Sequence, residues 1–282
     1  MNLFSSIYYL GPQGTFSEHL ANTHREFEHL KKIPVSSITQ IYLDVISNKK
    51  SLGLIPIENS TEGSVNESLN GLIDYNIEIV DELNMKIEHC LFSIEKTTKK
   101  IKKIYAHPQS IGQCNLWLHK HLPSVELIPT SSNGQAIQLA CNENSTAVIA
   151  GKHNQWLSLN LLCENIQNLK ENTTRFNVIT AANVNVDIEY DCLYKTSIAI
   201  SLDDDQGAGS LIGILRPFEE KDIPLTKLVS RPTNNDKWHY IFFIDFVSKY
   251  NEINDLLDLV KIKSSFFKSF GSYKISDTLI HD

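Results

Sequence analysis

The chain of 282 residues is long enough for two domains with separate cores, and it carries a formal net charge of −7. Hydrophobic residues make up 41% and charged residues 21%, a globular composition without a disordered tail. The negative charge and scattered lysines argue against a nucleic-acid partner, and the dense basic run KTTKKIKK (96–103) is interpreted as a solvated linker. No segment approaches the ~20 apolar residues of a membrane span and no signal-peptide pattern is present, so we expect a cytoplasmic protein without a membrane partner.

Cysteine and histidine spacing predicts neither disulfides nor a metal site. The five cysteines include no C-x-x-C pair, which fits reduced and mostly buried thiols. His119 and His121 are two residues apart, whereas His19, His24 and His29 are five apart. Neither spacing directs two imidazoles from one helix toward the same ion, so we expect no bound metal.

The first part of the chain alternates short apolar runs with helical patterns, which is typical of an α/β domain with a largely parallel sheet. Thr15 and Glu18 form a T-x-x-E pattern that predicts a helix start, and Ile38, Ile41 and Val45 mark the apolar face of a second helix. In chain order we predict a strand at 6–11, a helix after Thr15, a helix within 36–50, a strand at 51–60, a helix at 65–76 and extended chain from 77 to 94.

A second α/β unit follows and is expected to form a second lobe, at about residues 90–165. Two lobes joined by more than one strand form a cleft, and ligands bind such sheets at the carboxyl ends of strands. Three polar loops lie at such ends: IENSTEGS (57–64), AHPQS (106–110) and TSSNG (130–134). The predicted elements are strand 101–106, helix 111–122, strand 125–130, helix 133–143, strand 146–150, a short helix within 152–160 and strand 175–180.

The pattern changes after a boundary near residues 183–194. Strand, helix, strand, strand, helix and strand follow in the order β-α-β-β-α-β, which predicts a small ferredoxin-like module. It carries no plausible nucleophile or acid/base cluster, so we interpret it as a binding or regulatory domain. Its predicted elements are 195–202, 210–222, 224–232, 238–248, 251–263 and 267–275.

Several polar residues at strand ends are candidates for chemistry. Glu58 and Asn59 end a strand without a structural explanation. Gln113 has a competing interpretation, because Ser110 and Gln113 match a helix-capping S-x-x-Q box, and a side chain folded onto its own helix cannot also reach the cleft. Arg175 is a certain cation, although the segment around it, taken alone, is better explained as a loop that enters a strand. No serine, cysteine or lysine has an obvious adjacent base, so nucleophilic catalysis is not supported.

Taken together, five segments resemble one family closely, prephenate dehydratase in its form with a C-terminal ACT domain. They occur in order through nearly the whole chain: GPQGTFSEHLA (11–21), IPIENSTEGSV (55–65), AHPQSIGQCNLWL (106–118), NTTRFNVI (172–179) and LVSRP (228–232).

The resemblance implies that prephenate loses CO2 and water to give phenylpyruvate on the way to phenylalanine, without a cofactor. It implies a catalytic domain at 5–183 with two lobes like a periplasmic binding protein, and an ACT regulatory domain at 195–276. The family often carries a fused chorismate mutase ahead of this unit. Here the first predicted strand starts at Ser6, so we expect that activity to be absent.

By resemblance, the threonine regarded as essential falls on Thr174, and the other site positions fall on Glu58, Asn59, Gln113 and Arg175. We also assign Gln109, Ser60 and Thr15 to substrate binding. Because threonine is a weak acid, we expect Thr174 to donate a hydrogen bond to the departing hydroxyl rather than to transfer a proton early. Arg175 is expected to clamp a carboxylate, with support of the loop as the alternative. Glu58 would repel a dianion, so it is either protonated or turned away to hold Asn59.

The C-terminal module is expected to bind phenylalanine as feedback inhibitor. Two turns carry this by resemblance, and in this sequence they read Gly207-Ala208-Gly209 and Val229-Ser230-Arg231-Pro232. Both depart from the family pattern, since Gln206 replaces a proline, Gly209 a leucine and Val229 a glutamate, which loosens the expected pocket. Pairing of ACT domains implies a homodimer or homotetramer.

Two other functions remain open from the sequence. Arogenate dehydratase performs the same elimination on a substrate whose side chain carries an ammonium group. A ligand sensor would use the same fold without turnover.

Overall fold

The computed structural model describes residues 3–156, 158–182, 192–202, 209–232, 240–275 and 279–280. By its internal contacts the chain forms two units. The first contains Met1–Leu69, Leu83–Asn177 and Thr278–Asp282, and the second contains Asn70–Glu82 and Val178–Asp277. Within the described ranges, no helix combines the length and apolar character needed to span a membrane.

The first lobe is built on a seven-stranded sheet with the order β16-β5-β11-β3-β1-β2, and β4 pairs with β3. β1 lies parallel to both β2 and β3, as the alternating pattern predicts. The strands are β1 (Ser6–Leu10), β2 (Lys31–Val35), β3 (Ser51–Asn59), β4 (Gly63–Ser64), β5 (Ile77–Lys86), β11 (Thr173–Ala181) and β16 (Leu279–Ile280).

Side chains cap the helices of this lobe where the sequence indicates. The Thr15 hydroxyl accepts a hydrogen bond from Glu18 N at the start of α1 (Phe16–Thr23), and the Ser37 hydroxyl does the same for α2 (Ile38–Ser47). The predicted apolar face of α2 is buried, and Ile41 and Val45 are fully inaccessible. A 3-10 turn (Arg25–Phe27) and α3 (Asn66–Asp74) complete this part of the chain.

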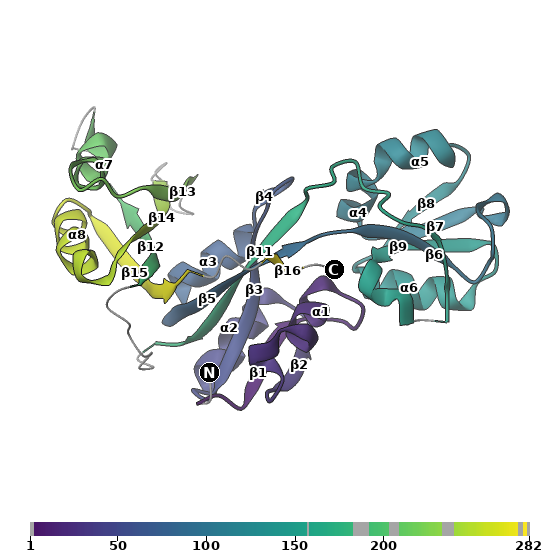
Figure 1. The fold of residues 1–282 in the computed structure, drawn as a ribbon, viewed down its shortest axis with the longest axis horizontal. Coiled ribbons are helices and arrows are strands. Elements are labelled where there is room, and N and C mark those ends of the chain that lie inside the picture. Colours follow the sequence, from purple (N-terminus) through teal and green to yellow (C-terminus); the bar gives the residue numbers. More distant parts are fainter. Residues whose placement is uncertain are drawn as a thin grey trace. The chain divides into compact units, whose positions relative to one another are not determined.

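The second lobe has a five-stranded sheet with the order β10-β6-β9-β7-β8. β7 lies parallel to β8 and β9, whereas β6 lies antiparallel to β9 and β10. Figure 1 shows α6 on one side of this sheet and α4 with α5 on the other, and each side has its own apolar core. The elements are β6 (His89–Ser93), β7 (Lys103–Ala106), α4 (Pro108–Gln113), α5 (Asn115–His121), β8 (Glu126–Pro129), α6 (Asn133–Asn142), β9 (Thr146–Gly151), a 3-10 helix (Lys152–Trp156) and β10 (Asn160–Cys163).

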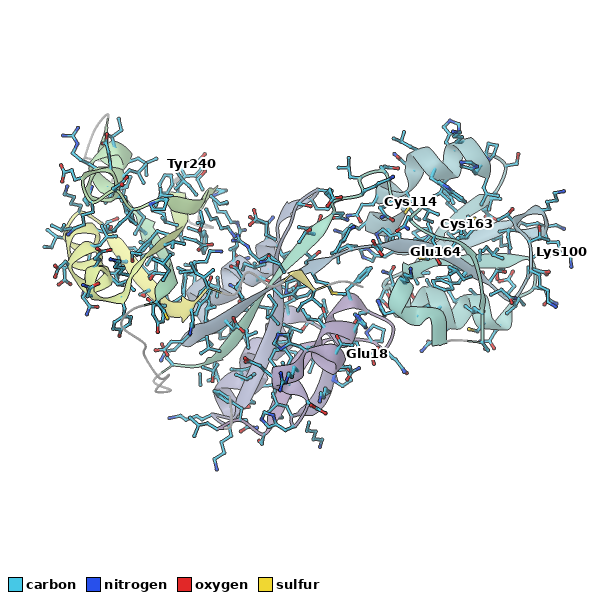
Figure 2. The ribbon with its side chains drawn as sticks, in the orientation of Figure 1. Glu18, Lys100, Cys114, Cys163, Glu164 and Tyr240 are labelled. Atoms are coloured by element: carbon cyan, nitrogen blue, oxygen red, sulfur yellow. The ribbon has the colours of Figure 1, made fainter. Side chains whose placement is uncertain are left out.

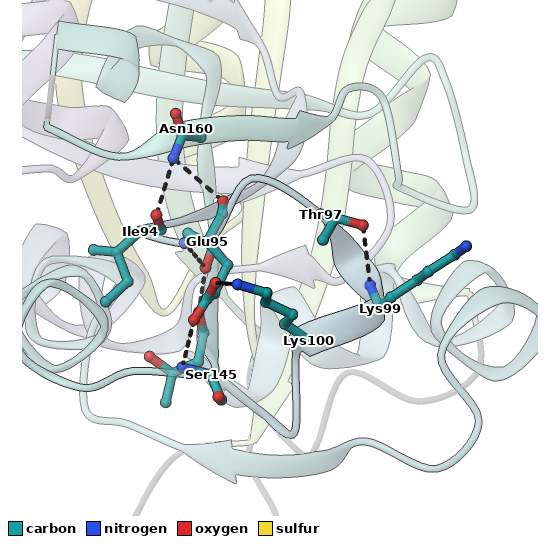
Figure 3. Close-up of polar contacts among 9 residues, drawn as sticks. Ile94, Glu95, Thr97, Lys99, Lys100, Ser145 and Asn160 are labelled. Atoms are coloured by element: carbon teal, nitrogen blue, oxygen red, sulfur yellow. Dashed lines mark hydrogen bonds and ion pairs between the residues drawn. The ribbon is translucent and has the colours of Figure 1, made fainter.

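The basic run between β6 and β7 is a surface turn whose charges are partly paired (Figure 3). Lys100 Nζ lies 3.2 Å from Glu95 Oε2, and Glu95 Oε1 accepts from Ser145 N at 3.4 Å. Lys103 pairs with Glu143 at 2.9 Å. These acidic partners fit the interpretation of the basic run as a solvated connection, because they pair with lysines that a bound anion would otherwise contact.

The second unit contains a four-stranded antiparallel sheet with the order β13-β14-β12-β15. Helices α7 and α8 pack on one face of it, where Ile214 and Phe218 of α7 and Leu256 of α8 meet Ile198 and Ile244 of the sheet. The elements follow in the predicted order: β12 (Leu193–Ser201), α7 (Ser210–Glu220), β13 (Leu225–Pro232), β14 (Tyr240–Lys249), α8 (Tyr250–Ile262) and β15 (Phe266–Lys274).

Candidate active site

A cavity of about 980 Å³ lies between the two lobes of the first unit. It is found where strands β1, β3, β7 and β8 end, which is the edge at which α/β sheets bind ligands. All three polar loops singled out from the sequence contribute to its wall. The lining residues are Leu10–Gln13, Thr15–Ser17, Pro34–Ile38, Pro56, Asn59, Val65, Glu67, His107, Gln109, Ser131–Asn133, Gln135, Gln138, Thr174 and Phe176.

The cavity wall offers neutral donors instead of cations. Among the described residues that line it, none is a lysine or an arginine. The N-terminal ends of α1, α2 and α6 reach the cavity instead, with their capping residues Thr15, Ser37 and Ser132 in the wall. Helix N-termini carry unpaired backbone N–H groups and partial positive charge, so this cavity suits a ligand with negative groups.

The turn before α1 already binds one carboxylate from the protein. The backbone N–H of Gly14 donates to Glu18 Oε2 at 2.6 Å, and Figure 2 shows Glu18 on α1. The Thr15 hydroxyl donates to Leu10 O at 3.0 Å while it accepts from Glu18 N at 3.2 Å. Its hydrogen is therefore used within the protein, so Thr15 contributes to the wall as a helix cap and not as a free hydroxyl donor.

His107 adds a neutral imidazole to the wall. Burial lowers its pKa below the usual value for histidine. Its Nδ1 accepts from Gln109 N at 3.3 Å, so the ring hydrogen sits on Nε2. The ring is thus a neutral hydrogen-bond donor near neutral pH.

Strand β11 alternates its side chains between the cavity and the opposite face of the sheet. Thr174 and Phe176 line the cavity. Arg175 lies between them in sequence and forms an ion pair with Glu58, and the two side chains are 14% and 32% exposed. Neither member of the pair is among the described lining residues of the cavity. The pair instead joins the ends of β11 and β3, which matches the alternative in which these residues support the loop.

The carboxamide of Asn59 has a defined orientation. Its Oδ1 accepts from Thr61 N (2.9 Å), Thr61 Oγ1 (2.6 Å) and Glu62 N (3.2 Å). Because two of these donors are backbone amides, the oxygen must occupy this position and Nδ2 the other. That Nδ2 donates to Thr174 Oγ1 and to Asn172 Oδ1, both at 2.8 Å. Thr174 is therefore an acceptor from Asn59.

Asn59, Asn172, Gln113 and Thr61 form a closed cycle of hydrogen bonds, which we call the hydrogen-bonded ring. Asn59 donates to Asn172, Asn172 Nδ2 donates to Gln113 Oε1 (3.0 Å), Gln113 Nε2 donates to Thr61 Oγ1 (3.0 Å), and Thr61 donates back to Asn59. His89 Nε2 lies 2.8 Å from Gln113 Oε1. The ring links the first lobe to α4 of the second. A smaller cavity, of about 140 Å³, adjoins Gln113, Thr61 and Asn172.

The structure thus separates the predicted site residues into two groups. Thr15, Asn59, Gln109 and Thr174 line the large cavity, whereas Glu58, Ser60, Gln113 and Arg175 are not among the described residues of its wall. The capping-box interpretation of Ser110 and Gln113 is wrong. His107 caps α4, the Ser110 hydroxyl donates to Asn133 Oδ1, and Gln113 belongs to the ring.

Ser60 ties two strand ends together instead of lining the cavity. Its backbone N donates to Thr173 O, and its hydroxyl accepts from Thr173 N at 3.0 Å. The sequence analysis did not identify Asn172, which is 1% exposed, or the buried His89. Asn172 is the first residue of the NTTRF segment. Its hydrogen bonds to Asn59 and Gln113, which only the structure shows, distinguish it from an ordinary loop residue.

The lobes also meet at a second place, which we call the glycine seam. It joins Gln13 and Gly14 of the first lobe to Gly134 and Asn154 of the second. A Cβ atom added to Gly134 would lie 2.2 Å from Gln13 O, and one added to Gly14, at φ +89°, would lie 3.6 Å from Gly134 Cα. Asn154 Nδ2 donates to Gly14 O at 3.3 Å. The backbones approach so closely that only glycine fits at position 134.

The residues expected to bind an effector lie in the second unit. Ser230, Arg231 and Pro232 end β13, and Arg231 Nη1 donates to Asn70 Oδ1 at 2.7 Å. Gly207 and Ala208 lie outside the described residues. Gly209 has φ +96° at the start of α7, where a leucine would be strained. In the described part of the chain, no group of three His, Cys, Asp or Glu side chains is arranged for a metal.

Comparison with known proteins relates this geometry to one family. The family model of prephenate dehydratase matches residues 7–184. A Pseudomonas aeruginosa protein named bifunctional chorismate mutase/prephenate dehydratase is 37% identical over 271 residues, which cover 95% of this chain and 72% of that protein. A prephenate dehydratase from Methanocaldococcus jannaschii is 31% identical over 277 residues, covering 96% and 99% of the two chains.

The crystal structure of a prephenate dehydratase from Arthrobacter aurescens in complex with L-Phe has a similar fold. Its TM-score is 0.86 at 26% identity, and the match covers 96% of this chain and 90% of that one. The family match and these relatives show that the chain belongs to the prephenate dehydratase family.

Proposed function

We propose that the chain catalyses the conversion of prephenate to phenylpyruvate, CO2 and water in the cavity between its lobes. The observation that carries this proposal is the hydrogen bond from Asn59 to Thr174 at the wall of a cavity suited to anions. It explains how a neutral threonine acts on a leaving hydroxyl. The relatives named above act on prephenate by their names, which supports the same substrate here.

The two carboxylates of prephenate are held by neutral donors in this proposal. The N-terminal ends of α1, α2 and α6 face the same cavity, and Gln109 and His107 add side-chain donors. Binding without a lysine or arginine contact leaves the ring carboxylate poorly neutralised, which favours its loss as CO2. Gln109 is therefore a binding residue, and Thr15 acts through the helix that it caps.

The proposed reaction is an elimination in which the electron pair of the broken bond enters the ring, a ring double bond shifts, and the C–O bond to the hydroxyl breaks. The bond between the ring and its carboxylate breaks, the electron pair expels the ring hydroxyl, and the ring becomes aromatic. The departing hydroxide takes a proton, which solvent supplies overall, so no general base is required. Thr174 stabilises the departing oxygen because its own oxygen accepts from Asn59, which leaves its hydroxyl hydrogen available to the cavity.

The other predicted residues act behind the cavity wall. Asn59 orients Thr174, and Gln113 is part of the ring that holds Asn59. Ser60 and the Glu58–Arg175 pair join β3 to β11, so they set the position of Thr174 and do not contact substrate.

The second unit is the regulatory part of this proposal. Its antiparallel sheet with two helices on one face supports a ferredoxin-like ACT domain. We propose that it binds phenylalanine near Ser230, Arg231 and Pro232, and that the chain forms a homodimer or homotetramer. Isothermal titration with phenylalanine and a molar-mass measurement by light scattering test these two points. The absence of binding at millimolar phenylalanine would contradict the first.

A kinetic assay of the purified protein tests the proposed activity. Prephenate is expected to yield phenylpyruvate, detected by its ultraviolet absorbance, with turnover lost in Thr174→Val. Parallel assays with arogenate separate the two dehydratases, since faster turnover of arogenate would reassign the substrate. Binding of either compound without turnover would instead identify a ligand sensor.

A further inference from the structure

The hydrogen-bonded ring has one direction, and the backbone determines it. Each of its four side chains donates to the next: Asn59 to Asn172, Asn172 to Gln113, Gln113 to Thr61, and Thr61 to Asn59. The opposite direction would require Asn59 to present its NH2 group to the backbone N–H groups of Thr61 and Glu62, which is excluded because both are donors. The direction of every bond in the ring follows from these two amides.

The direction matters because Asn59 has two hydrogens to give. One goes to Asn172 within the ring and the other goes to Thr174. If Asn172 did not accept the first, Asn59 would keep the contacts to its Oδ1 but lose the one contact on its Nδ2 that directs the other hydrogen toward Thr174. Bonds in a ring of this kind also polarise one another, so each strengthens the next.

From this arrangement we propose that Asn172 is a positioning residue, whose side chain keeps Thr174 oriented as a hydrogen-bond donor to the leaving group. Asn172 joins the two amides assigned from the sequence, Asn59 and Gln113, on one side of the ring, and Thr61 joins them on the other. It is 1% exposed and is not among the described residues lining the large cavity, so it acts through Asn59 and not on the substrate. The proposal rests on the dehydratase activity proposed above.

The chemistry of Asn172 makes the role testable. It must accept from Asn59 and donate to Gln113 at the same time. An ionised aspartate accepts but cannot donate, so Asn172→Asp breaks the ring at Gln113. A protonated aspartic acid has one O–H donor and one carbonyl acceptor, so it can restore both bonds. Burial raises the pKa of such a carboxyl group, which brings the change into an accessible pH range.

The experiment measures the pH profile of kcat for Asn172→Asp and for the wild-type protein. The pH is varied from about 5.5 to about 8.5, the range in which a carboxyl group with a raised pKa is expected to titrate. We expect kcat to be about tenfold or more below wild type at the alkaline end and to recover to within about threefold at the acidic end, with KM changed little. Circular dichroism at each pH checks that the variant is folded.

A matched control is Asn160→Asp. The Nδ2 of Asn160 donates to Ile94 O at 3.0 Å and to Glu95 O at 3.2 Å, but Asn160 is an exposed residue at the start of strand β10 (Figure 3). Its kcat relative to wild type is expected to be independent of pH. A second variant, Asn172→Ser, cannot bridge Asn59 and Gln113, so its kcat should be about tenfold low at every pH.

Three results would overturn the proposal. They are a pH-independent loss in a folded Asn172→Asp, a kcat near wild type in Asn172→Asp at alkaline pH, and a kcat near wild type in Asn172→Ser. A wild-type protein that does not turn over prephenate would instead contradict the proposed function, so the two failures are distinguishable.

Discussion

The two contacts between the lobes differ in the groups that form them. The hydrogen-bonded ring joins polar side chains through bonds of fixed direction, and Thr174 depends on it for its orientation. The glycine seam joins two backbones that approach too closely for any side chain. The cavity is lined by residues from both, Asn59 of the ring and Gln13 of the seam. We therefore expect substitutions in the ring to affect mainly the chemical step and substitutions in the seam to affect mainly substrate binding.

Among the substitutions that alter these two contacts, the largest effect is expected from Asn59→Asp, because it reverses the hydrogen bond between Asn59 and Thr174. The aspartate oxygen still accepts from Thr61 N and Glu62 N, so the loop should keep its shape. Its second oxygen can only accept, so Thr174 would donate to it and lose its hydrogen for the leaving group. We expect kcat to fall about 100-fold with a KM close to wild type, measured by phenylpyruvate formation. An increase in KM with an unchanged kcat would show that the ring serves binding instead.

A smaller effect is expected from Gly134→Ala, which breaks the seam and leaves the ring intact. The added Cβ would lie 2.2 Å from Gln13 O and 2.7 Å from Pro12 Cγ, so the lobes cannot approach as closely. The extra methyl group should cost about 1–3 kcal/mol by overpacking where the lobes meet. We expect this cost to raise KM roughly tenfold and to reduce kcat less. Gly213→Ala is the control, because nothing lies within 4 Å of its added Cβ. A kcat loss as large as that of Asn59→Asp would contradict the division between seam and ring.

The Glu58–Arg175 pair should affect stability more than kinetics. Its side chains are only 14% and 32% exposed, and it joins β3 to β11 behind the cavity wall. Arg175→Met is expected to lower the free energy of unfolding by about 1–3 kcal/mol in urea titrations, with KM changed less than about threefold. The more exposed pair Lys152–Glu164 serves as control, and Lys152→Met should lower the free energy of unfolding less than Arg175→Met does, because solvent screens an exposed pair. A KM raised without loss of stability would favour the carboxylate clamp predicted from the sequence.

The smallest effect, a change in the pH dependence of stability, is expected from substitution of His24, which lies in neither the ring nor the seam. Burial lowers its pKa, and the nearby Glu26 opposes this only in part. The unfolded chain therefore binds more protons than the folded chain below about pH 6.5, so the free energy of unfolding falls as pH decreases through that range. In His24→Gln this pH dependence should become shallower. Thermal unfolding of the wild-type protein and the variant at about pH 7.5 and about pH 5.5, roughly one unit above and below the reference pKa of histidine, measures this pH dependence.

The sequence predicted most of the elements because their patterns are strong. The apolar face of α2 and the Thr15 cap of α1 were both identified from spacing alone. Strand β2 (Lys31–Val35) was not predicted, since it lies at the sheet edge, has no fully buried residue and contains Pro34. Strand β10 was missed for the same reason, because it is a short edge strand of the second sheet.

The site was harder to predict than the fold. Asn59 and Thr174 were identified, and the structure brings them within 2.8 Å of each other from positions 115 residues apart. Gln113 carried two interpretations because local capping and a distant partner use the same side-chain groups. Asn172 has no local signal, since its role depends on two partners from other parts of the chain.

One measurement tests the central claim most directly, the kcat for prephenate of Thr174→Ser beside that of Thr174→Val. Serine keeps a hydroxyl that Asn59 can orient, whereas valine has nearly the same shape and no hydroxyl. The account predicts that Thr174→Ser retains turnover within about tenfold of wild type, whereas Thr174→Val loses roughly 100-fold or more. Equal turnover in the two variants would contradict the account, because the hydroxyl of Thr174 would then have no part in the reaction.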